Sequence, residues 1–506
     1  MVPNGAAFAA NGFMGTAFAE EIAEKIEERF LETGEPNGLT LIFCAAQGDK
    51  KKKGLQHLAH KGLIRKTIGG HYGLASKIGT MVFENEIAAF DFPQGVMAHL
   101  LRDISSHRPG ELTKVGIGTF VDPRYGGGKM NRLTEPEEDM VQLVNLNGED
   151  YLFYKTFPID FAIIAGTYAD EDGNISFERE GVKSEALDLA MACKSCGGTV
   201  VVQVQRVVRS GSLDPRKVEI PGVLVDAVVV ASDLKYCMQN FGSQYNPGFS
   251  GEHRMGLSEF MPEPLGAKKI IARRAAMELK RGSVVNLGVG IPEYISSVAL
   301  EEEITDKFTL TVESGLFGGN PQSGFDFGVS LNPTCMVTMP TMFDFYQGGG
   351  LDQAFVGFAE SDVKGNVNVS KFGSILPGCG GFIDITQNAK RVYFCGTFTA
   401  RGLEIKAGDG RLEIVKEGAV DKFGESVEQI TFSAETALKN KLPVLYITER
   451  AVFQLTENGL MLCEAAPGID LQRDLFGHMA KKPILSPNFK RMDERIFRDE
   501  KMGLKE

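Results

Sequence analysis

Basic residues are scarce in this chain relative to acidic ones. Its 506 residues include 54 Lys and Arg against 66 Asp and Glu, which gives a net charge of −12 and a pI of about 5.3. A protein that binds nucleic acid or an anionic membrane through its general surface needs a basic face. We therefore expect neither kind of partner, although a local basic patch for an anionic cofactor stays compatible with this composition.

Long hydrophobic runs and a secretory signal are also absent. The first basic residue is Lys25, so the positively charged start of a signal peptide is missing. No uninterrupted apolar stretch approaches the ~20 residues that span a bilayer. The eight cysteines are scattered, and most have apolar neighbours, as Cys44 and Cys395 do. Such cysteines are typical of reduced, buried thiols, so we expect a cytoplasmic protein.

Several familiar catalytic motifs do not occur either. There is no GxSxG nucleophile elbow. Cys193 and Cys196 form one CxxC without a second pair, which favours ordinary cysteines at a helix end over a metal or redox site. His57 and His60, with His71 nearby, lack the adjacent ligands that a tetrahedral zinc site requires. We therefore predict no bound metal.

Glycine, by contrast, is abundant. The 59 glycines imply many tight turns, or places where the backbone must approach another group closely. Helix-like and strand-like stretches alternate throughout, which predicts an α/β class. At a typical ~100–200 residues per domain, the length predicts about two to four domains.

Part of the sequence is an internal duplication. Two segments each place an Asp before a short apolar run, followed by a polar stretch, Gly-Asn and an alternating segment. Asp160 and Asp352 are 192 residues apart, and so are Gly173 and Gly365. Each copy predicts a strand, a loop, a Gly-Asn turn and a second strand.

A looser pair of segments extends this duplication. The stretches from Ala10 and from Asn286 both run from an apolar strand through glycines into a helix, and a second strand follows each helix. Aligning these following strands places Cys44 opposite Glu313. The second copy thus carries a carboxylate where the first has a small neutral residue.

A boundary between the two copies is predicted at about residues 251–264, which contain proline, glycine and mixed charge. A helix follows from Ala267, with Gly282 placed to end it. We therefore predict two homologous open α/β halves, residues 1–250 and residues 265–506. Each half is expected to be a largely parallel sheet with helices on both faces, and ligands bind such sheets beyond the carboxyl ends of the strands.

Glu313 stands where that rule points. It follows an apolar, β-branched run from Thr309 to Val312, which predicts a buried strand, and it precedes Ser314, Gly315 and further glycines. A carboxylate at a strand end in a low-dielectric cleft is disfavoured as an anion and becomes a better nucleophile. An ordinary loop carboxylate explains the same spacing, so the residues alone leave both interpretations open.

Other stretches could bind an anion or line a pocket. The glycine turn at 286–295 has Pro292 suited to a first helical turn, whose free N–H groups attract anions; a purely structural connection explains it equally. Four lysines at 50–53 and the stretch at 124–131 fit solvated loops, with phosphate contact as the alternative. Residues 377–387 open with glycines before a β-like stretch, and a bare turn explains them almost as well.

Six segments taken together carry a family resemblance: TVESGLFGG, NLGVGIPE, DFPQGVMAHLLRDISSHRPG, GIGTFVDPRYGGGK, FDFYQGGGLD and GCGGFIDITQNAKRVYFCGTFTA. They resemble the family I CoA-transferases, and in particular the bacterial propionate or acetate CoA-transferases that fuse both halves in one chain. The resemblance runs along almost the whole sequence in the right order. Family chains usually carry a short extra segment before the first glycine turn, so a first strand or helix is expected either to be lacking here or to have been trimmed.

The resemblance implies roles for individual residues. Glu313 corresponds to the nucleophile, and Gln94 to an oxyanion donor from the N-terminal half. A backbone N–H of Gly380 or Gly381 corresponds to a second donor, and many relatives have Asn where Ser314 stands. The segment that corresponds to a CoA-contacting loop consists of Gly288, Val289, Gly290, Ile291 and Pro292. The implied active site lies between the two halves.

The implied activity is CoA transfer between acyl-CoA and short-chain carboxylates of the acetate or propionate type. It proceeds by ping-pong kinetics through a glutamyl-CoA thioester. CoA and acyl-CoA are substrates, no permanently bound cofactor is expected, and the resemblance implies a homo-oligomer, a dimer or a tetramer. An acyl-CoA hydrolase that uses the same Glu is the main alternative, and a catalytically silent CoA-binding protein is another.

Overall fold

A computed structural model describes residues 2–256 and 262–504 of the chain. The chain folds into two compact units that alternate along the sequence. Unit 1 contains Met1–Met255, Val312–Gln347 and Gly373–Asp384, and unit 2 contains Gly256–Thr311, Gly348–Phe372 and Ile385–Glu506. These units do not follow the predicted halves 1–250 and 265–506, because two segments of the second half pack in unit 1. Residues 257–261 of the predicted linker lie outside the described residues.

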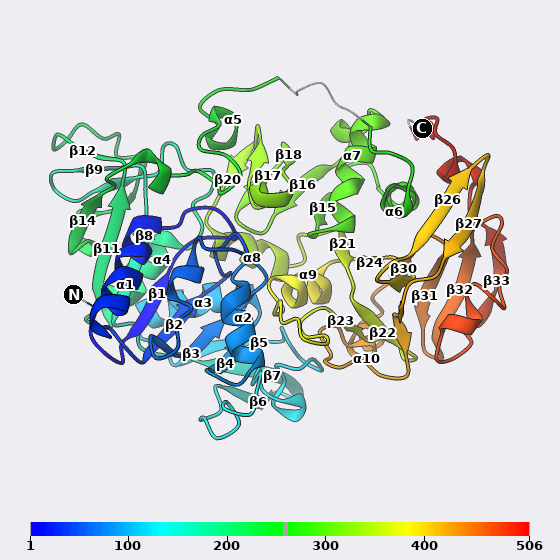
Figure 1. The fold of residues 1–506 in the computed structure, drawn as a ribbon, viewed down its shortest axis with the longest axis horizontal. Helices are drawn as coiled ribbons and strands as arrows, with labels where there is room; N and C mark the ends of the chain where they lie inside the picture. The colour runs from blue at the N-terminus through cyan, green and yellow to red at the C-terminus, as the bar shows by residue number, and fades with distance from the viewer. Residues whose placement is uncertain (1, 257–261, 505–506) are drawn as a thin grey trace. The chain divides into compact units, whose positions relative to one another are not determined.

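Unit 1 is built on a seven-stranded sheet in the order β14-β11-β8-β1-β2-β3-β4 (Figure 1). Its strands are β1 (Ala7–Ala10), β2 (Leu39–Phe43), β3 (Ile64–Gly69), β4 (Ala88–Asp91), β8 (Phe161–Ala165), β11 (Thr199–Val204) and β14 (Ala227–Val230). All neighbouring strands are parallel, as predicted. The order reverses at β1, which pairs with both β2 and β8. Open α/β sheets bind ligands beside the carboxyl ends of strands at such a switch point.

The strands of this sheet are mostly apolar, and helices help to bury them. Every residue of β2 and of β8 is buried, as is usual for parallel strands covered on both faces. The main helices of this unit are α1 (Glu20–Thr33), α2 (Ser76–Phe83), α3 (Gln94–Ser105) and α4 (Ala186–Ser195). Helix α4 contacts β8, β11 and α3. Side chains of α3 such as Val96, Met97 and Leu100 are fully buried, and each contributes ~1.5–3 kcal/mol of hydrophobic stabilisation.

Smaller elements complete unit 1. From the first half of the sequence they are β5 (Gly110–Thr113), β6 (Val141–Leu146), β7 (Glu149–Lys155), β9 (Tyr168–Asp170), β10 (Ile175–Ser176), β12 (Arg206–Val208), β13 (Val218–Ile220) and α5 (Pro247–Ser250). From the second half they are β17 (Leu316–Phe317), β18 (Asn320–Pro321), β19 (Ser330–Leu331), β20 (Cys335–Met336) and α8 (Met339–Gln347). These second-half elements carry part of the candidate site.

Unit 2 carries consecutive strands of a second sheet, in the order β16-β15-β21-β24-β30-β31-β32-β33. Its strands are β15 (Val284–Leu287), β16 (Thr309–Val312), β21 (Gln353–Gly357), β24 (Val392–Cys395), β30 (Val444–Ile447), β31 (Ala451–Thr456), β32 (Gly459–Ala465) and β33 (Ile484–Arg491). The strands from β16 to β30 are parallel, and β31 and β32 follow as an antiparallel extension. The predicted strand from Thr309 to Val312 is confirmed as β16. None of the helices in the described ranges has the length and apolar character needed to cross a membrane.

Other elements of the second half follow the same pattern of short strands and helices. They are α6 (Ala267–Ala276), α7 (Tyr294–Glu301), α10 (Ala434–Lys439), β22 (Glu360–Asp362), β23 (Val367–Asn368), β25 (Thr399–Ala400), β26 (Glu404–Gly408), β27 (Arg411–Lys416), β28 (Val420–Asp421) and β29 (Phe423–Gly424).

The 192-residue duplication is confirmed by matching hydrogen bonds. Asp160, just before β8, accepts a hydrogen bond from the Ala7 N–H at 2.8 Å, which ties β8 to the start of β1. Asp352, just before β21, accepts one from the Val284 N–H at 2.9 Å, which ties β21 to the start of β15. The repeated Asp therefore aligns the central strand pair in each copy.

The helix predicted from Ala267 ends earlier than expected. Helix α6 stops at Ala276, and the predicted end at Gly282 is wrong. The side chain of Gln353 donates to the Glu278 carbonyl at 2.7 Å and accepts from the Lys280 N–H at 2.9 Å. A buried side chain thus satisfies the backbone groups that a longer helix would have paired.

The β-like stretch expected within 377–387 is also wrong, because it forms helix α9 (Phe382–Asn388). Gly378 and Gly380 have φ of 77° and 52°, so the backbone turns sharply just before the helix. Asp384 lies in the first turn, where a carboxyl group is favoured by the helix dipole. The strand propensity of Ile383 and Ile385 is a weak preference that this environment overrides.

Candidate functional site

Glu313 lies in a tight turn of unit 1, directly after β16. Its side chain is buried, with 9% exposed. The apolar neighbours Val312 and Leu316 pack in a core cluster with Ala17, Val182, Phe249 and Val329. These contacts anchor the chain on both sides of the carboxylate and fix its position.

The glycine after this carboxylate is required by the turn. Gly315 has a φ of 118°, and a Cβ atom added there would lie 2.1 Å from the Val337 carbonyl oxygen. The Gly315 carbonyl accepts a hydrogen bond from the Val337 N–H at 2.8 Å. On the other side, the Ser314 hydroxyl donates to the Gly328 carbonyl at 2.7 Å. Ser314 therefore holds the turn instead of pointing to a ligand.

Gln94 is the first residue of α3 and follows β4 across Phe92 and Pro93. Its side chain is 1% exposed. The amide Nε2 lies 3.4 Å from Sδ of Met339, two residues beyond Val337. Since a thioether is a weak acceptor, the amide keeps capacity to donate to a stronger one. The segment 337–339 therefore joins the Glu313 turn to Gln94, and residues from both sequence halves meet within unit 1.

The glycines at 380 and 381 lie against Gln94. The Gly380 carbonyl accepts from the Gln94 N–H at 2.9 Å, and the Gly380 N–H donates to the Gly70 carbonyl at 2.5 Å. The Gly380 N–H is thus already used in this structure. Within the described ranges, no group accepts a hydrogen bond from the Gly381 N–H. Of the two predicted donors, Gly381 is the one whose amide is available.

Two fully buried aspartates fasten these segments to each other. Asp91, at the end of β4, accepts from the Cys379 N–H at 2.9 Å. Asp384 accepts from the Gly95 N–H at 3.0 Å and from the Gln347 side-chain amide at 2.9 Å. Each half therefore supplies a carboxyl group that binds a backbone amide next to a predicted oxyanion donor.

Burial controls the protonation of these two carboxyl groups. It raises the pKa of Asp384 to about 7, although the Gly95 N–H and His99 favour the ionised form. It also raises the pKa of Asp91 well above its ordinary value, against the opposing effect of Cys379. Both groups are thus shifted toward the neutral form by desolvation.

The predicted CoA-contacting residues belong to unit 2. Gly288, Val289, Gly290, Ile291 and Pro292 connect β15 to a short 3₁₀ turn, Ile291–Glu293, which continues into α7. Pro292 lies in the first helical turn, as predicted, and Gly290 has a φ of 94°. The Gly290 N–H donates to the Glu293 carboxylate at 2.9 Å. The Val289 side chain is 52% exposed.

The other sequence candidates have structural partners. The Asp49 carboxylate accepts from the backbone N–H groups of residues 51, 52 and 53, so the lysine stretch forms an ordered loop. His57 lies between Glu20 and Glu27, at 3.1 Å and 2.5 Å, and His60 also reaches Glu27. Across the residues that the structure describes, no cluster of His, Cys, Asp and Glu is arranged to hold a metal ion. Cys196 is the C-cap of α4, as expected for a helix-end cysteine.

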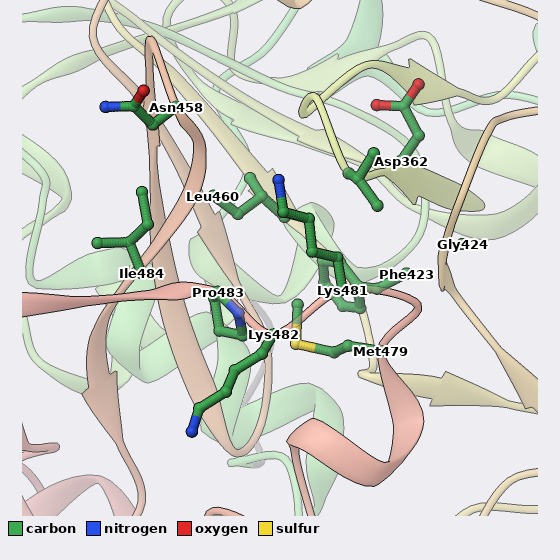
Figure 2. Close-up of a pocket in the computed structure, with 11 residues that line it drawn as sticks. Asp362, Phe423, Gly424, Asn458, Leu460, Met479, Lys481, Lys482, Pro483 and Ile484 are labelled. Atoms are coloured by element: carbon green, nitrogen blue, oxygen red, sulfur yellow. The ribbon is translucent and has the colours of Figure 1, made fainter.

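A cavity of about 250 Å³ lies in unit 2 (Figure 2). Its lining residues are Asp362, Val363, Phe423, Gly424, Asn458, Leu460, Met479, Lys481, Lys482, Pro483 and Ile484. In Figure 2 the Lys482 side chain points away from Asp362, and its Nζ lies 4.7 Å from the centre of the Phe476 ring. None of the predicted site residues lines this cavity.

Comparison with known proteins identifies the class of this fold and site. Residues 1–231 match the coenzyme A transferase family. A caffeate CoA-transferase of Acetobacterium woodii is 45% identical over 100% of this chain and 97% of its own length. The acetate CoA-transferase YdiF of Escherichia coli O157:H7 is 43% identical over 97% of this chain and 91% of its own.

Solved structures agree with these relatives. The crystal structure of the YdiF apoenzyme from E. coli O157:H7 superposes with a TM-score of 0.94 at 42% identity, covering 99% of this chain and 95% of that one. A thioester complex of the same enzyme with CoA gives a TM-score of 0.93. The chain therefore belongs to the family I CoA-transferases, in the branch that carries both halves in one polypeptide, and it is a CoA-transferase.

Sequence reasoning missed three residues that organise the site. They are Met339, Asp91 and Asp384. Asp91 lies three residues before Gln94, and Asp384 lies three residues after Gly381. The sequence signal for each aspartate is an acidic residue within an apolar segment, one in each half of the chain. Only the folded chain shows that each carboxyl group binds the other segment.

Proposed function

We propose that Glu313 is the nucleophile of an acyl-CoA:carboxylate CoA-transferase. Its carboxylate oxygen attacks the thioester carbonyl of acyl-CoA, and the C–S bond breaks to give CoA thiolate and a mixed anhydride. The thiolate then attacks the glutamyl carbonyl, which releases the first carboxylate and leaves a glutamyl-CoA thioester. A second carboxylate attacks this thioester, and the same steps in reverse yield a new acyl-CoA and free Glu313.

We further propose that Gln94 and the Gly381 N–H stabilise the tetrahedral oxyanions. Among the described residues, the Gln94 amide donates to the weak thioether acceptor of Met339, and the Gly380 N–H is engaged by the Gly70 carbonyl. Removing one oxyanion donor typically raises the barrier by ~2.7–4 kcal/mol. The turn residues 288–292 are proposed to contact CoA.

The observation that carries this proposal is the convergence of three segments in unit 1. The Glu313 turn and Gln94 both contact the segment 337–339, and Gln94 also pairs with Gly380. A buried carboxylate is thereby placed in one framework with two candidate oxyanion donors. Such fixed placement is what covalent catalysis requires.

We propose short-chain carboxylates as the acceptors. Relatives of this chain are named for acetate and for caffeate, so the acid that this chain uses has to be measured directly. Acetyl-CoA should be tested as donor against a panel of acetate, propionate, butyrate and lactate. We also propose a homo-oligomeric protein in the cytoplasm, with CoA and the acids as its only small-molecule partners.

The experiment that separates transfer from hydrolysis measures thiol release and product acyl-CoA together. With acetyl-CoA and propionate, a transferase forms propionyl-CoA, and free thiol accumulates slowly with or without the acid. Rapid thiol release without any acceptor would instead support a hydrolase. A catalytically silent CoA-binding protein would show neither product.

A further inference from the structure

A continuous series of contacts in unit 1 connects the Glu313 turn to the oxyanion segment, and it starts at Ser314, the residue after the nucleophile. Ser314 donates to the Gly328 carbonyl at 2.7 Å. A Cβ atom added at Gly328 would lie 2.6 Å from the Phe13 ring, so this ring covers that part of the turn. The loop after β1, which contains Gly12 and Phe13, is therefore a direct neighbour of the Glu313 turn.

The series continues across the carboxyl ends of β2 and β3. A Cβ atom added at Gly12 would lie 3.1 Å from Cγ of Gln47, so this side chain passes close to the β1 loop. Its chain neighbour Ala46 donates through its N–H to the His71 carbonyl at 2.9 Å. A Cβ atom added at Gly380 would lie 3.5 Å from the His71 ring. Gln47 and His71 thus connect the β1 loop, which adjoins the Glu313 turn, to the oxyanion segment.

Gln47 and His71 carry buried polar atoms that form no hydrogen bond with the described residues. Gln47 is 0% exposed, and neither Nε2 nor Oε1 of its amide has a hydrogen-bond partner among the described residues. The buried Nδ1 of His71 has none either. Leaving a buried polar group unpaired is costly, so such groups call for an external partner.

The chemistry of the two groups limits that partner. An amide offers one donor and one acceptor face, and a neutral imidazole offers one of each. Burial lowers the pKa of His71 to about 4, with Lys50 acting in the same direction, so the ring is uncharged at neutral pH. A hydroxyl group, which both donates and accepts, matches these two side chains, whereas an alkyl group leaves them unpaired.

We infer that Gln47 and His71 form a specificity site that recognises a hydroxyl group on the acyl chain of the acid. The preferred acceptor is then a hydroxy acid instead of the alkyl acid of equal length. This inference rests on the proposed function, because it assumes that the acid reacts at Glu313. Sites built to bind a substrate hydroxyl discriminate strongly against analogues that lack it.

The test compares three acids with equal carbon number: propionate, lactate and 3-hydroxypropionate, each with acetyl-CoA as donor. We expect kcat/KM for the better hydroxy acid to exceed that for propionate by at least ~10-fold. In Gln47→Met, which keeps the length of the side chain, this ratio should fall by at least ~10-fold. His71→Phe should lower it as well, and His71→Asn, which retains a polar atom near Nδ1, should restore part of it.

A matched control is Gln56→Met. Gln56 is also 0% exposed, but its amide is paired with Ser76 at 3.2 Å and with the Lys77 N–H at 3.0 Å. This variant should lose stability without any change in the acid ratio. If Gln47→Met fails to fold, the comparison of His71→Phe with His71→Asn tests the inference.

The outcomes separate this inference from the activity on which it rests. The hydroxyl site alone would be overturned if the parent transferred CoA to several acids with similar kcat/KM for the hydroxy acids and propionate. It would also be overturned if Gln47→Met and His71→Phe kept the parent's ratio of these kcat/KM values. Absence of transfer to every acid, acetate included, would overturn the proposed function itself.

Discussion

Asp384→Asn should make the protein more stable at alkaline pH, although it alters a buried carboxyl group beside the candidate site. Burial raises the pKa of Asp384 in the folded state from its ordinary value of 3.8 to about 7. A raised folded-state pKa means that the stabilisation linked to this proton is complete below pH 3.8 and is lost as the pH rises to about 7. At about 1.4 kcal/mol per tenfold change in proton affinity, the loss approaches ~4 kcal/mol.

Asparagine has nearly the same shape but no titrating proton. Its carbonyl oxygen can accept from the Gly95 N–H, and its amide can donate to Gln347 once that side-chain amide turns over. Asp384→Asn should therefore match the parent near pH 4 and exceed it by up to ~4 kcal/mol at pH 8. Asp384→Ala should be less stable than the parent near pH 4, because it leaves the buried Gly95 N–H unpaired, at ~1–3 kcal/mol, and removes the partner of the partly buried Gln347 amide.

The assay is the free energy of unfolding by urea at several pH values, with Asp362→Asn as control. Asp362 is also buried and also accepts backbone N–H groups, but it lies in unit 2. A difference between Asp384→Asn and the parent that stays constant from pH 4 to pH 8 would refute the reasoning. The opposite slope, with the variant losing stability as the pH rises, would refute it as well.

Three further predictions concern the site and its support. Gln94→Ala should lower kcat by ~10²–10³-fold with little change in the KM for CoA, and a change in KM alone would make Gln94 a binding residue. Gly315→Ala should destabilise the Glu313 turn and abolish transfer, since its Cβ would lie 2.1 Å from the Val337 carbonyl; parent-like activity would contradict this turn geometry. Burial opposes the charged form of His99, but Asp344 and Glu111 outweigh it and raise its pKa to about 10. The stability that His99→Gln loses should thus be largest below pH 6.5 and should fade toward pH 10, and a pH-independent loss would argue against these ion pairs.

The alternation of elements and the internal duplication could be predicted from the sequence because both are local. The β-branched run before Glu313 and the repeated Asp–apolar pattern depend on nearest neighbours and on a fixed offset. Helix ends were harder: α6 ends at Ala276 because Gln353, distant in sequence, binds the backbone beyond it. The same holds for α9, where tertiary contacts of Asp384 outweigh the strand propensity of the neighbouring isoleucines.

The residues of the candidate site could likewise be predicted only in part from the sequence. Glu313 could be selected as a candidate from its position at a strand end, and the roles of Gln94 and the glycine segment came from the family resemblance. The choice between Gly380 and Gly381 required the hydrogen bond to Gly70, which no sequence pattern indicates. The unpaired amide of Gln47 likewise becomes visible only once its surroundings are known.

The most direct test of the central claim is the intact mass of the enzyme after exposure to acyl-CoA without an acceptor acid, followed by peptide mapping. The account predicts a covalent CoA adduct on the peptide that contains Glu313, absent in Glu313→Ala and retained in Glu404→Ala, a control at an exposed carboxylate. An active enzyme with no CoA adduct, or with the adduct on another residue, would contradict it.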